Sequence, residues 1–365
     1  MDRRSLLTGA GLAAGTALAA PLAAPAYAQG KRQLKMVTTW PKGLPGLGTL
    51  AENTAKRITE ATEGQIAIKV YAGGELIGPF EAFDAVSQGS AEMYHGAEYY
   101  WQGKSIGFNF FTAVPFGLNA AEYDAWLNFG GGQALWDELS ARFKIKAFNA
   151  GNTGVQMGGW YNREILSVED FKGLKIRMPG LGGEVMRRLG AAAVSIPGGD
   201  IYQALQTTQI DATEWVGPWN DRALGFQRVA KYYYWPGWHE PGSALALGIN
   251  KDVWDSFTKH QQTLIAVCCQ AETHMNLAEF NHRNAGELKK LQDAGVALRR
   301  FPDPVLKALG ETSEAVVKEV VEAAKDELVT RIYQGFLEAR RIGTVWGEIS
   351  EEGYAQARRL ALGAG

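Results

Sequence analysis

The chain has 365 residues, a formal net charge of −2 at pH 7 and 21% charged residues. This length allows two domains with substantial cores, and the charge balance excludes the basic surface of a nucleic-acid-binding protein. The 11 Trp, 13 Tyr and 15 Phe are expected mainly in cores, although such rings also line ligand clefts.

An export signal is predicted over residues 1–28. Arg3-Arg4 precede an Ala/Gly/Leu-rich run, and Ala26-Tyr27-Ala28 fits a small-residue cleavage site before Gln29. The arginine pair favours the twin-arginine route without establishing it. We therefore expect a mature chain that works in the periplasm. No later segment approaches the ~20 apolar residues that span a membrane, so this mature chain should be soluble.

Strands and helices alternate in the first part of the mature chain. Strands are predicted over 35–40, 65–71 and 91–95, with helices over 47–61 and 80–88 between them. This alternation predicts parallel pairing in an α/β domain. Two further helices and a strand follow, over 121–129, 134–143 and 145–150.

A second α/β block follows a glycine-rich passage that we interpret as a hinge or crossover. Its predicted strands and helices cover 154–161, 174–178, 184–189, 193–196, 201–206 and 212–216. A strand over 243–249 is expected to return to the first block, and helices fill the chain beyond Lys251.

These patterns predict two domains and a helical tail. Domain I comprises 29–153 and about 243–285, and domain II comprises 154–242 and about 286–330. Residues 331–365 form a C-terminal helical segment with apolar residues at three- and four-residue spacings before and within it. Such a tail more often packs on its own domain, but a dimer contact is the alternative.

Three local motifs are discounted. Gly46-Leu47-Gly48-Thr49-Leu50-Ala51 resembles a dinucleotide fingerprint, but prolines interrupt its turn and no acidic residue ends the second strand. Gly103-Lys104-Ser105-Ile106-Gly107 has nucleophile-elbow spacing without a following helix. The adjacent Cys268 and Cys269 would point in different directions from a helix, so we predict buried apolar roles for them.

The stretch 173–180 predicts a short strand that carries an arginine. Apolar residues alternate with Arg177 and a lysine, Pro179-Gly180 ends the pattern, and a glycine-rich helix start follows. A guanidinium keeps its charge and matches a carboxylate with two donors, and a helix N-terminus also favours an anion. Arg177 is therefore a candidate carboxylate ligand. The alternative is an arginine that reaches solvent or pairs with a structural Asp or Glu.

Oxygen ligands for a cation occur in the same block. Gln156 lies in the glycine-flanked strand, Glu214 near the end of the strand predicted over 212–216, and Glu240 after an aromatic turn. Two carboxylates and an amide oxygen suit Na⁺ or Ca²⁺ better than zinc. Each residue also has an ordinary interpretation as a solvated polar side chain.

With these residues, the chain resembles the periplasmic solute receptors of TRAP transporters, over essentially the whole mature sequence. The most specific segment is Phe171 to Pro179: the acidic residue before its turn, its glycine and its strand arginine match the family pattern. Gln156, Glu214-Trp215 and the aromatic turn before Glu240 look closest to the 2-oxo-acid branch.

The resemblance implies two α/β domains around a cleft, crossing strands that form a hinge, and a C-terminal helix that swaps between protomers of a homodimer. It further implies that Arg177 binds the ligand carboxylate. Substrate-contact candidates beside Arg177 are Gln156, Tyr100, Asn152 and Trp219. The implied ligands of Na⁺, with Ca²⁺ as the alternative, are Gln156, Glu214, the Trp215 carbonyl and Glu240.

We therefore expect a non-enzymatic receptor that binds a pyruvate-like 2-oxo monocarboxylate with a cation and delivers it to the membrane components of a TRAP transporter. One alternative is a receptor for another solute, such as lactate, a dicarboxylate, an amino acid or a sugar. The other is an exported hydrolase in which Glu214 and Glu240 act as acid and base, although no catalytic motif accompanies them.

Overall fold

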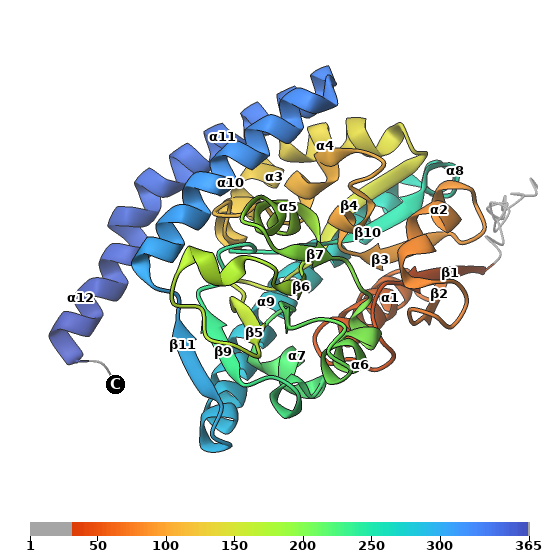
Figure 1. Ribbon diagram of the computed structural model, residues 1–365. Coiled ribbons are helices and arrows are strands. Elements are labelled where there is room, and N and C mark those ends of the chain that lie inside the picture. Colours follow the sequence, from red (N-terminus) through yellow and green to blue (C-terminus); the bar gives the residue numbers. More distant parts are fainter. Residues whose placement is uncertain (1–30, 364–365) are drawn as a thin grey trace, which may run out of the picture. The chain divides into compact units, whose positions relative to one another are not determined.

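The computed structural model describes residues 31–363, so the predicted export signal lies outside the described residues. Helices and strands form a mixed α/β fold with two separate sheets, which we name sheet I and sheet II (Figure 1). The α/β prediction is confirmed.

Sheet I has five strands in the order β2-β1-β3-β10-β4. β1 pairs in parallel with β2 and β3, as the alternation of strands and helices predicted. β10 runs antiparallel between β3 and β4, so the strand expected near 243–249 does return to the first sheet. The strand bounds are Arg32–Thr38 (β1), Ile66–Tyr71 (β2), Met93–Gly96 (β3), Ile145–Asn152 (β4) and Ala244–Asn250 (β10).

Helices pack on sheet I and enclose aromatic cores. α1 and the long α9 contact each other, and they pack on β2 and β4, respectively. Phe111 stacks between Trp126 of α3 and Trp136 of α4, with ring centroids 5.4 and 5.1 Å apart. The helix bounds are Gly48–Ala61 (α1), Ala82–Ser87 (α2), Ala120–Phe129 (α3), Gly132–Ala141 (α4), Lys251–Asp255 (α8) and Lys259–Asp293 (α9).

Sheet II has six short strands in the order β11-β9-β5-β8-β6-β7. β6 pairs in parallel with β7 and β8, whereas β5 is antiparallel to β8 and β9. The strand bounds are Gly159–Tyr161 (β5), Lys175–Arg177 (β6), Ala192–Val194 (β7), Ala212–Thr213 (β8), Tyr232–Trp235 (β9) and Ala297–Arg300 (β11). The accompanying helices are Gly180–Arg188 (α5), Ile201–Gln206 (α6), Pro218–Ala223 (α7) and Asp303–Ala324 (α10).

Several predicted boundaries in this part of the chain were wrong, and two strands were missed. The strand expected over 154–161 begins only at Gly159, which has φ +106° and where a Cβ would lie 2.5 Å from the Thr213 carbonyl oxygen. The strand expected to end at Val216 ends at Thr213. The helix after β6 begins at Gly180 rather than Glu184, and β9 and β11 were not predicted.

The chain passes between the sheets three times, once through α8 and α9, and the other two connections hydrogen-bond to each other. Connector A, residues 153–158, joins β4 to β5, and connector B, residues 236–243, joins β9 to β10. Gln156 donates its backbone N–H to the Glu240 carbonyl at 3.2 Å, and Gly237 donates to the Gln156 carbonyl at 2.9 Å. Sheet I thus takes its strands from 32–152 and 244–250, and sheet II from 159–235 and 297–300. The domain boundaries themselves remain a prediction.

A helical arm ends the described chain, passing from Glu327–Gly347 (α11) through a π-helical turn, Glu348–Glu352, to Gly353–Leu362 (α12) (Figure 1). α11 buries Leu328, Val329, Ile332 and Phe336, and it contacts α3 and α4. The arm beyond residue 341 leaves large apolar side chains exposed. The predicted long helical tail is confirmed.

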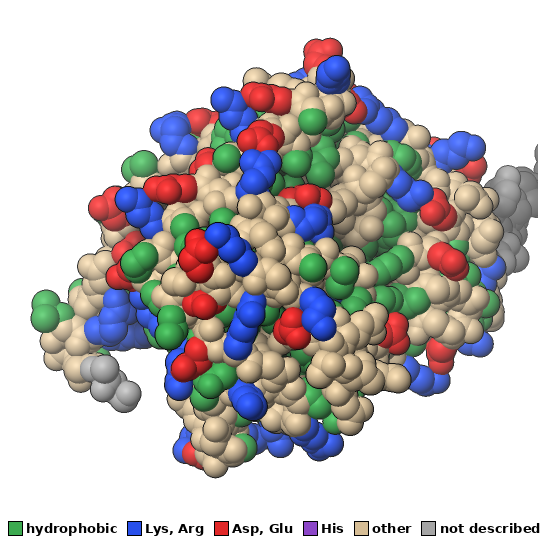
Figure 2. All heavy atoms as spheres, viewed as in Figure 1, with side chains coloured by type: hydrophobic (Ala, Val, Ile, Leu, Met, Phe, Trp, Pro, Cys, Tyr) green, Lys and Arg blue, Asp and Glu red, His purple; other side chains and the backbone are tan. Residues whose placement is uncertain are grey.

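Charges of both signs are interspersed over the face of the molecule that Figure 2 shows. Cys268 and Cys269 are buried free thiols in α9, as predicted. Within residues 31–363, we find no helix whose length and apolar character would let it cross a bilayer.

Candidate functional site

Arg177 is the last residue of β6, and its side chain is 1% exposed. The guanidinium forms an ion pair with Glu214, donates from Nε to the Ile196 carbonyl at 3.1 Å and donates from Nη2 to the Tyr100 hydroxyl at 3.2 Å. A weaker Nη1 contact, at 3.4 Å, reaches the Glu214 carbonyl. A guanidinium has five N–H donors, so these contacts leave one donor for another partner.

Both candidate carboxylates are buried beside this arginine. Glu214 follows β8 and Glu240 lies in connector B, and they are 0% and 3% exposed. Burial raises the pKa of Glu240 to about 7, and the charge of Glu214 adds to this shift. The two acids and one guanidinium therefore leave an excess of negative charge in a buried place.

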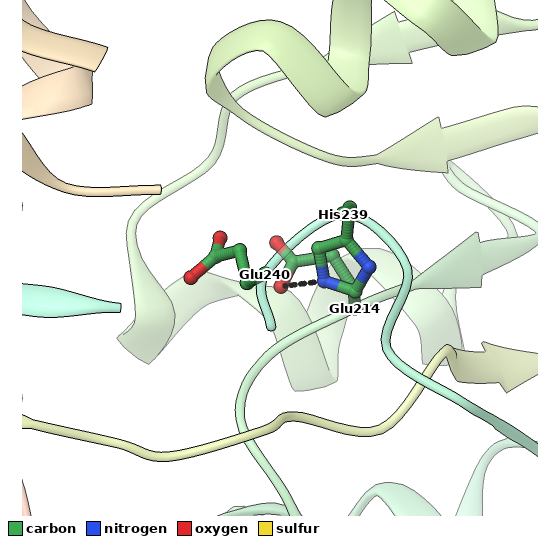
Figure 3. Close-up of side chains that lie close together, drawn as sticks. All are labelled: Glu214, His239 and Glu240. Atoms are coloured by element: carbon green, nitrogen blue, oxygen red, sulfur yellow. Dashed lines mark hydrogen bonds and ion pairs between the residues drawn. The ribbon is translucent and has the colours of Figure 1, made fainter. Parts of the chain in front are cut away.

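His239 completes the cluster, and its position was not predicted. Its Nε2 lies 3.2 Å from Glu214 Oε2, and one ligand atom from each of Glu214, His239 and Glu240 falls within 4.8 Å of the others (Figure 3). The aromatic turn 235–239 was noted in the sequence, but no local signal shows that connector B directs this ring toward Glu214.

Gln156 joins the cluster from connector A. Its Nε2 donates to Glu240 Oε2 at 2.8 Å and to Thr153 Oγ1 at 3.2 Å. Its Oε1 is buried and accepts no hydrogen bond from the described residues. A buried amide oxygen without a donor, next to two buried carboxylates, is a donor set that fits a hard cation such as Na⁺ or Ca²⁺.

Two more of the predicted residues, Trp215 and Tyr100, contact Arg177, whereas Asn152 contacts connector A. Trp215 stacks under Arg177, with the guanidinium carbon 5.0 Å from its ring centroid. Tyr100, in a short 3₁₀ turn over Glu98–Trp101, contacts Arg177 as described. Asn152, at the end of β4, accepts from the Gly154 N–H at 2.9 Å and thereby shapes the start of connector A.

Trp219 is placed differently from the other candidates. It lies in α7, where its ring packs edge-on against Phe280 of α9 at 5.5 Å and lies 5.8 Å from the Arg283 guanidinium. The contacts found for it in the described chain are thus with α9 rather than with Arg177.

A small cavity lies against the cluster, with about 240 Å³ of space not filled by atoms, including its opening to solvent. Two of its lining residues, Tyr100 and Gln156, are those that touch Arg177 and Glu240. No lining residue is charged; they are Trp40, Leu47, Ala97, Tyr99, Tyr100, Thr153, Gln156, Trp215, Val216, Ser243 and Leu245. Sequence reasoning missed the first-sheet members Trp40, Leu47 and Leu245, because an apolar side chain carries no sign of which cavity it will line.

Comparison with known proteins identifies the class. The chain belongs to the bacterial extracellular solute-binding proteins of family 7, whose model matches residues 36–324. Among its relatives is the monocarboxylate 2-oxoacid-binding periplasmic protein of Nostoc sp. (strain PCC 7120), which is 40% identical over 320 residues, 88% of this chain and 87% of the relative.

Several solved structures are similar over 90% of this chain, among them one from Pseudoalteromonas atlantica and one from Bordetella bronchiseptica. A TRAP periplasmic solute-binding protein from Pseudoalteromonas atlantica, with bound sodium and pyruvate, has a TM-score of 0.86 and 36% identity over 99% of its own length. A TRAP transporter solute-binding protein from Bordetella bronchiseptica has a TM-score of 0.88 and 35% identity over 98% of its length. It is a mixed-occupancy dimer, with calcium and picolinate bound in an active site and with an apo site.

Proposed function

We propose that this protein is the extracytoplasmic receptor of a TRAP transporter and binds a 2-oxo monocarboxylate such as pyruvate together with Na⁺ or Ca²⁺. The observation that carries the proposal is the buried cluster of Arg177, Glu214, Glu240 and the unpartnered Gln156 Oε1. The Nostoc relative and the sodium–pyruvate and calcium–picolinate neighbours support the same ligand class.

Charge compensation explains why an acid and a cation would bind together. Arg177 now compensates Glu214, and a ligand carboxylate entering alone would add a third negative charge beside one arginine. Gln156 Oε1, Glu214, Glu240 and the Trp215 carbonyl would hold the cation, which supplies the missing positive charge. Arg177 can then direct donors to the ligand carboxylate, and a 2-oxo oxygen beside that carboxylate can complete the cation's shell.

The cavity wall favours a monocarboxylate over a dicarboxylate. Since no lining residue is charged, a second carboxylate on the ligand would be buried without a cationic partner. An unpaired buried carboxylate is strongly unfavourable. We therefore expect pyruvate-like acids and lactate to bind more tightly than dicarboxylates. Because a 2-oxo or 2-hydroxy oxygen can also bind the cation, we expect such acids to bind more tightly than simple fatty acids.

The buried acids serve binding rather than catalysis in this proposal, because Glu214 is already held by Arg177 and His239. The periplasmic location expected of the family requires export of the chain. The signal predicted over residues 1–28 would direct this export, by the twin-arginine route in our interpretation. The membrane partners would be the other components of a TRAP transporter, and a homodimer with exchanged C-terminal helices would use the exposed arm.

The Arg177→Ala variant tests the proposal. Removing one partner of a buried charged pair typically costs about 2–5 kcal/mol of binding free energy, so pyruvate affinity should fall by a factor of ~30 or more in calorimetric titration. Arg163→Ala is the matched control, because Arg163 is exposed and bonds only nearby carbonyls. Arg177→Lys, which keeps the charge but loses the planar fork, should also bind more weakly. Pyruvate affinity equal to wild type in both Arg177 variants would refute the assignment.

A further inference from the structure

The buried imidazole of His239 has two chemically reasonable roles. It could bind the cation through Nε2, because one ligand atom from each of Glu214, His239 and Glu240 falls within 4.8 Å of the others. Alternatively, it could hold Glu214 by the hydrogen bond drawn in Figure 3. The other ring nitrogen, Nδ1, distinguishes these roles, since it is buried and has no hydrogen-bond partner among the described residues.

A ligand role would leave a buried N–H group without an acceptor. An imidazole nitrogen that binds a metal ion carries no proton, so the ring proton then lies on the other nitrogen. Histidine ligands nearly always donate that N–H to a carboxylate, a carbonyl or a water molecule. At His239 the proton would lie on Nδ1, for which the described residues provide no acceptor. With a proton on Nε2, the ring instead donates to Glu214 Oε2, at 3.2 Å.

We propose that His239 is a positioning residue, which orients the Glu214 carboxylate toward the cation without binding the cation itself. This inference rests on the proposed function and assigns a role to a further residue of the same site. Arg177 pairs with Glu214 Oε1 and His239 donates to Oε2, so both oxygens of this carboxylate are held. A ligand carboxylate would compete with Glu214 for the donors of Arg177, whereas the hydrogen bond from His239 would remain.

The surrounding packing keeps the His239 ring in this orientation. The ring meets Trp238 edge-on, with centroids 5.6 Å apart. Trp238 in turn stacks on Phe116 at 6.1 Å, and its carbonyl accepts the Phe116 backbone N–H at 2.8 Å. On the side of α5, a Cβ added to Gly182 would lie only 3.1 Å from the Cβ of His239. Because packing fixes the ring, its donor is directed at Glu214 without the ordering of a free side chain.

Two substitutions separate the Nε2 donor from the rest of the side chain. Glutamine places its amide nitrogen as many bonds from the backbone as His239 Nε2, so His239→Gln can keep the hydrogen bond to Glu214. Asparagine is one bond shorter and reaches only the position of Nδ1, so His239→Asn stays polar but loses that bond. Removing a hydrogen bond that orients a metal ligand typically lowers metal affinity by about 10–100-fold.

The test is a pair of calorimetric titrations of the metal-free protein: Ca²⁺ in excess pyruvate, and pyruvate in excess Ca²⁺. In His239→Asn, Ca²⁺ affinity should fall about tenfold or more, whereas pyruvate affinity in excess Ca²⁺ should change much less. His239→Gln should restore most of the Ca²⁺ affinity. His260→Asn is the control for the substitution itself, because His260 is exposed in α9. Na⁺ replaces Ca²⁺ in both titrations if wild type responds to Na⁺ alone.

The outcomes separate this inference from the proposed function. Absence of pyruvate binding to wild type with either ion would overturn the proposed function itself. Wild-type Ca²⁺ affinity in His239→Asn would leave the function standing and overturn the positioning role, and so would an equal loss in His239→Asn and His239→Gln. A merely structural histidine would lower the melting temperature of both variants and leave the Ca²⁺ affinity of the folded protein unchanged. His239→Phe, a ring without the donor, provides the same comparison if His239→Asn fails to fold.

Discussion

At the scale of residues, the site is organised by buried charge. Arg177, Glu214 and Glu240 lie within a few per cent of complete burial, and such charges persist only when they are paired and hydrogen-bonded. The sequence left open whether Arg177 serves a ligand or a structural acid. In the structure, Arg177 pairs with Glu214. Glu240 adds a second buried acid beside this pair, so the pairing by itself does not exclude a role of Arg177 in binding a ligand.

A second buried acid, Glu98, predicts a pH dependence of stability. It accepts hydrogen bonds from the Tyr94 hydroxyl and from Trp136 Nε1, the latter at 2.7 Å. Burial raises its pKa from 4.5 to about 7. The folded state therefore binds the proton more tightly than the unfolded state, so the contribution of Glu98 to stability is full below pH 4.5 and is lost as pH rises to 7.

Glu98→Gln should remove this contribution to the pH dependence while keeping the side-chain shape. Urea unfolding at pH 5 and pH 8 should show a smaller loss of unfolding free energy in the variant than in wild type, by up to about 3 kcal/mol. Burial also raises the pKa of Asp221, to about 6, which lowers stability with rising pH in the same way. The unfolding free energy of the variant should therefore still fall somewhat as pH rises. An identical pH dependence in both proteins would contradict this account.

At the scale of elements, the strands of sheet I were predicted from alternation and turn residues, because each is long enough to show a pattern. β9 was missed because Tyr232 to Trp235 is a continuous aromatic run without alternation, and β11 because its four residues include two arginines. Connector A was taken for a strand because its glycines lie between apolar residues, whereas the backbone N–H groups of Thr153 and Gln156 donate to connector B.

The residues of the candidate site also differ in how far the sequence could predict them. The strand pattern and the chemistry of arginine singled out Arg177, but only the family resemblance joined it to Gln156, Glu214 and Glu240, which are far apart in sequence. The position of His239 depends on how connector B folds, and that of Trp40 depends on its bond to His95. Neither contact leaves a local trace in the sequence.

The elements also divide the site into two parts. The proposed cation ligands come from connector A, connector B and the segment after β8, and the connectors are hydrogen-bonded to each other. Sheet I and its loops supply Trp40, Leu47 and Tyr100. The proposed oxygen ligands thus come from outside the strands of sheet I, whereas the proposed acid would lie between these ligands and the residues that sheet I and its loops supply.

At the scale of the whole molecule, the C-terminal arm carries an apolar stripe that its own chain does not cover. Ile342, Val345, Trp346 and Ile349 are 55–71% exposed and follow one another at intervals of three, one and three residues, from the end of α11 into the π-helical turn. Scattered apolar residues need no partner, but a stripe of this kind marks an interaction surface. A second copy of the chain is the proposed occupant.

Replacing two residues of the stripe should therefore break the proposed dimer. Trp346→Glu with Ile349→Glu should sediment as a monomer at concentrations at which wild type sediments as a dimer, with unchanged circular dichroism. Gln356→Glu, an exposed substitution on the same arm, is the control for added charge. A monomeric wild type, or a variant that remains dimeric, would contradict the dimer proposal.

The central claim is that a 2-oxo monocarboxylate and a cation bind together, and one calorimetric measurement tests it most directly. Pyruvate is titrated into the protein in choline buffer after removal of Na⁺ and Ca²⁺, and again after either ion is restored. Because the ligand carboxylate otherwise joins two buried acids beside one arginine, we predict at least tenfold weaker binding without the cation. Equal pyruvate affinity in the cation-free and cation-containing buffers would contradict the account.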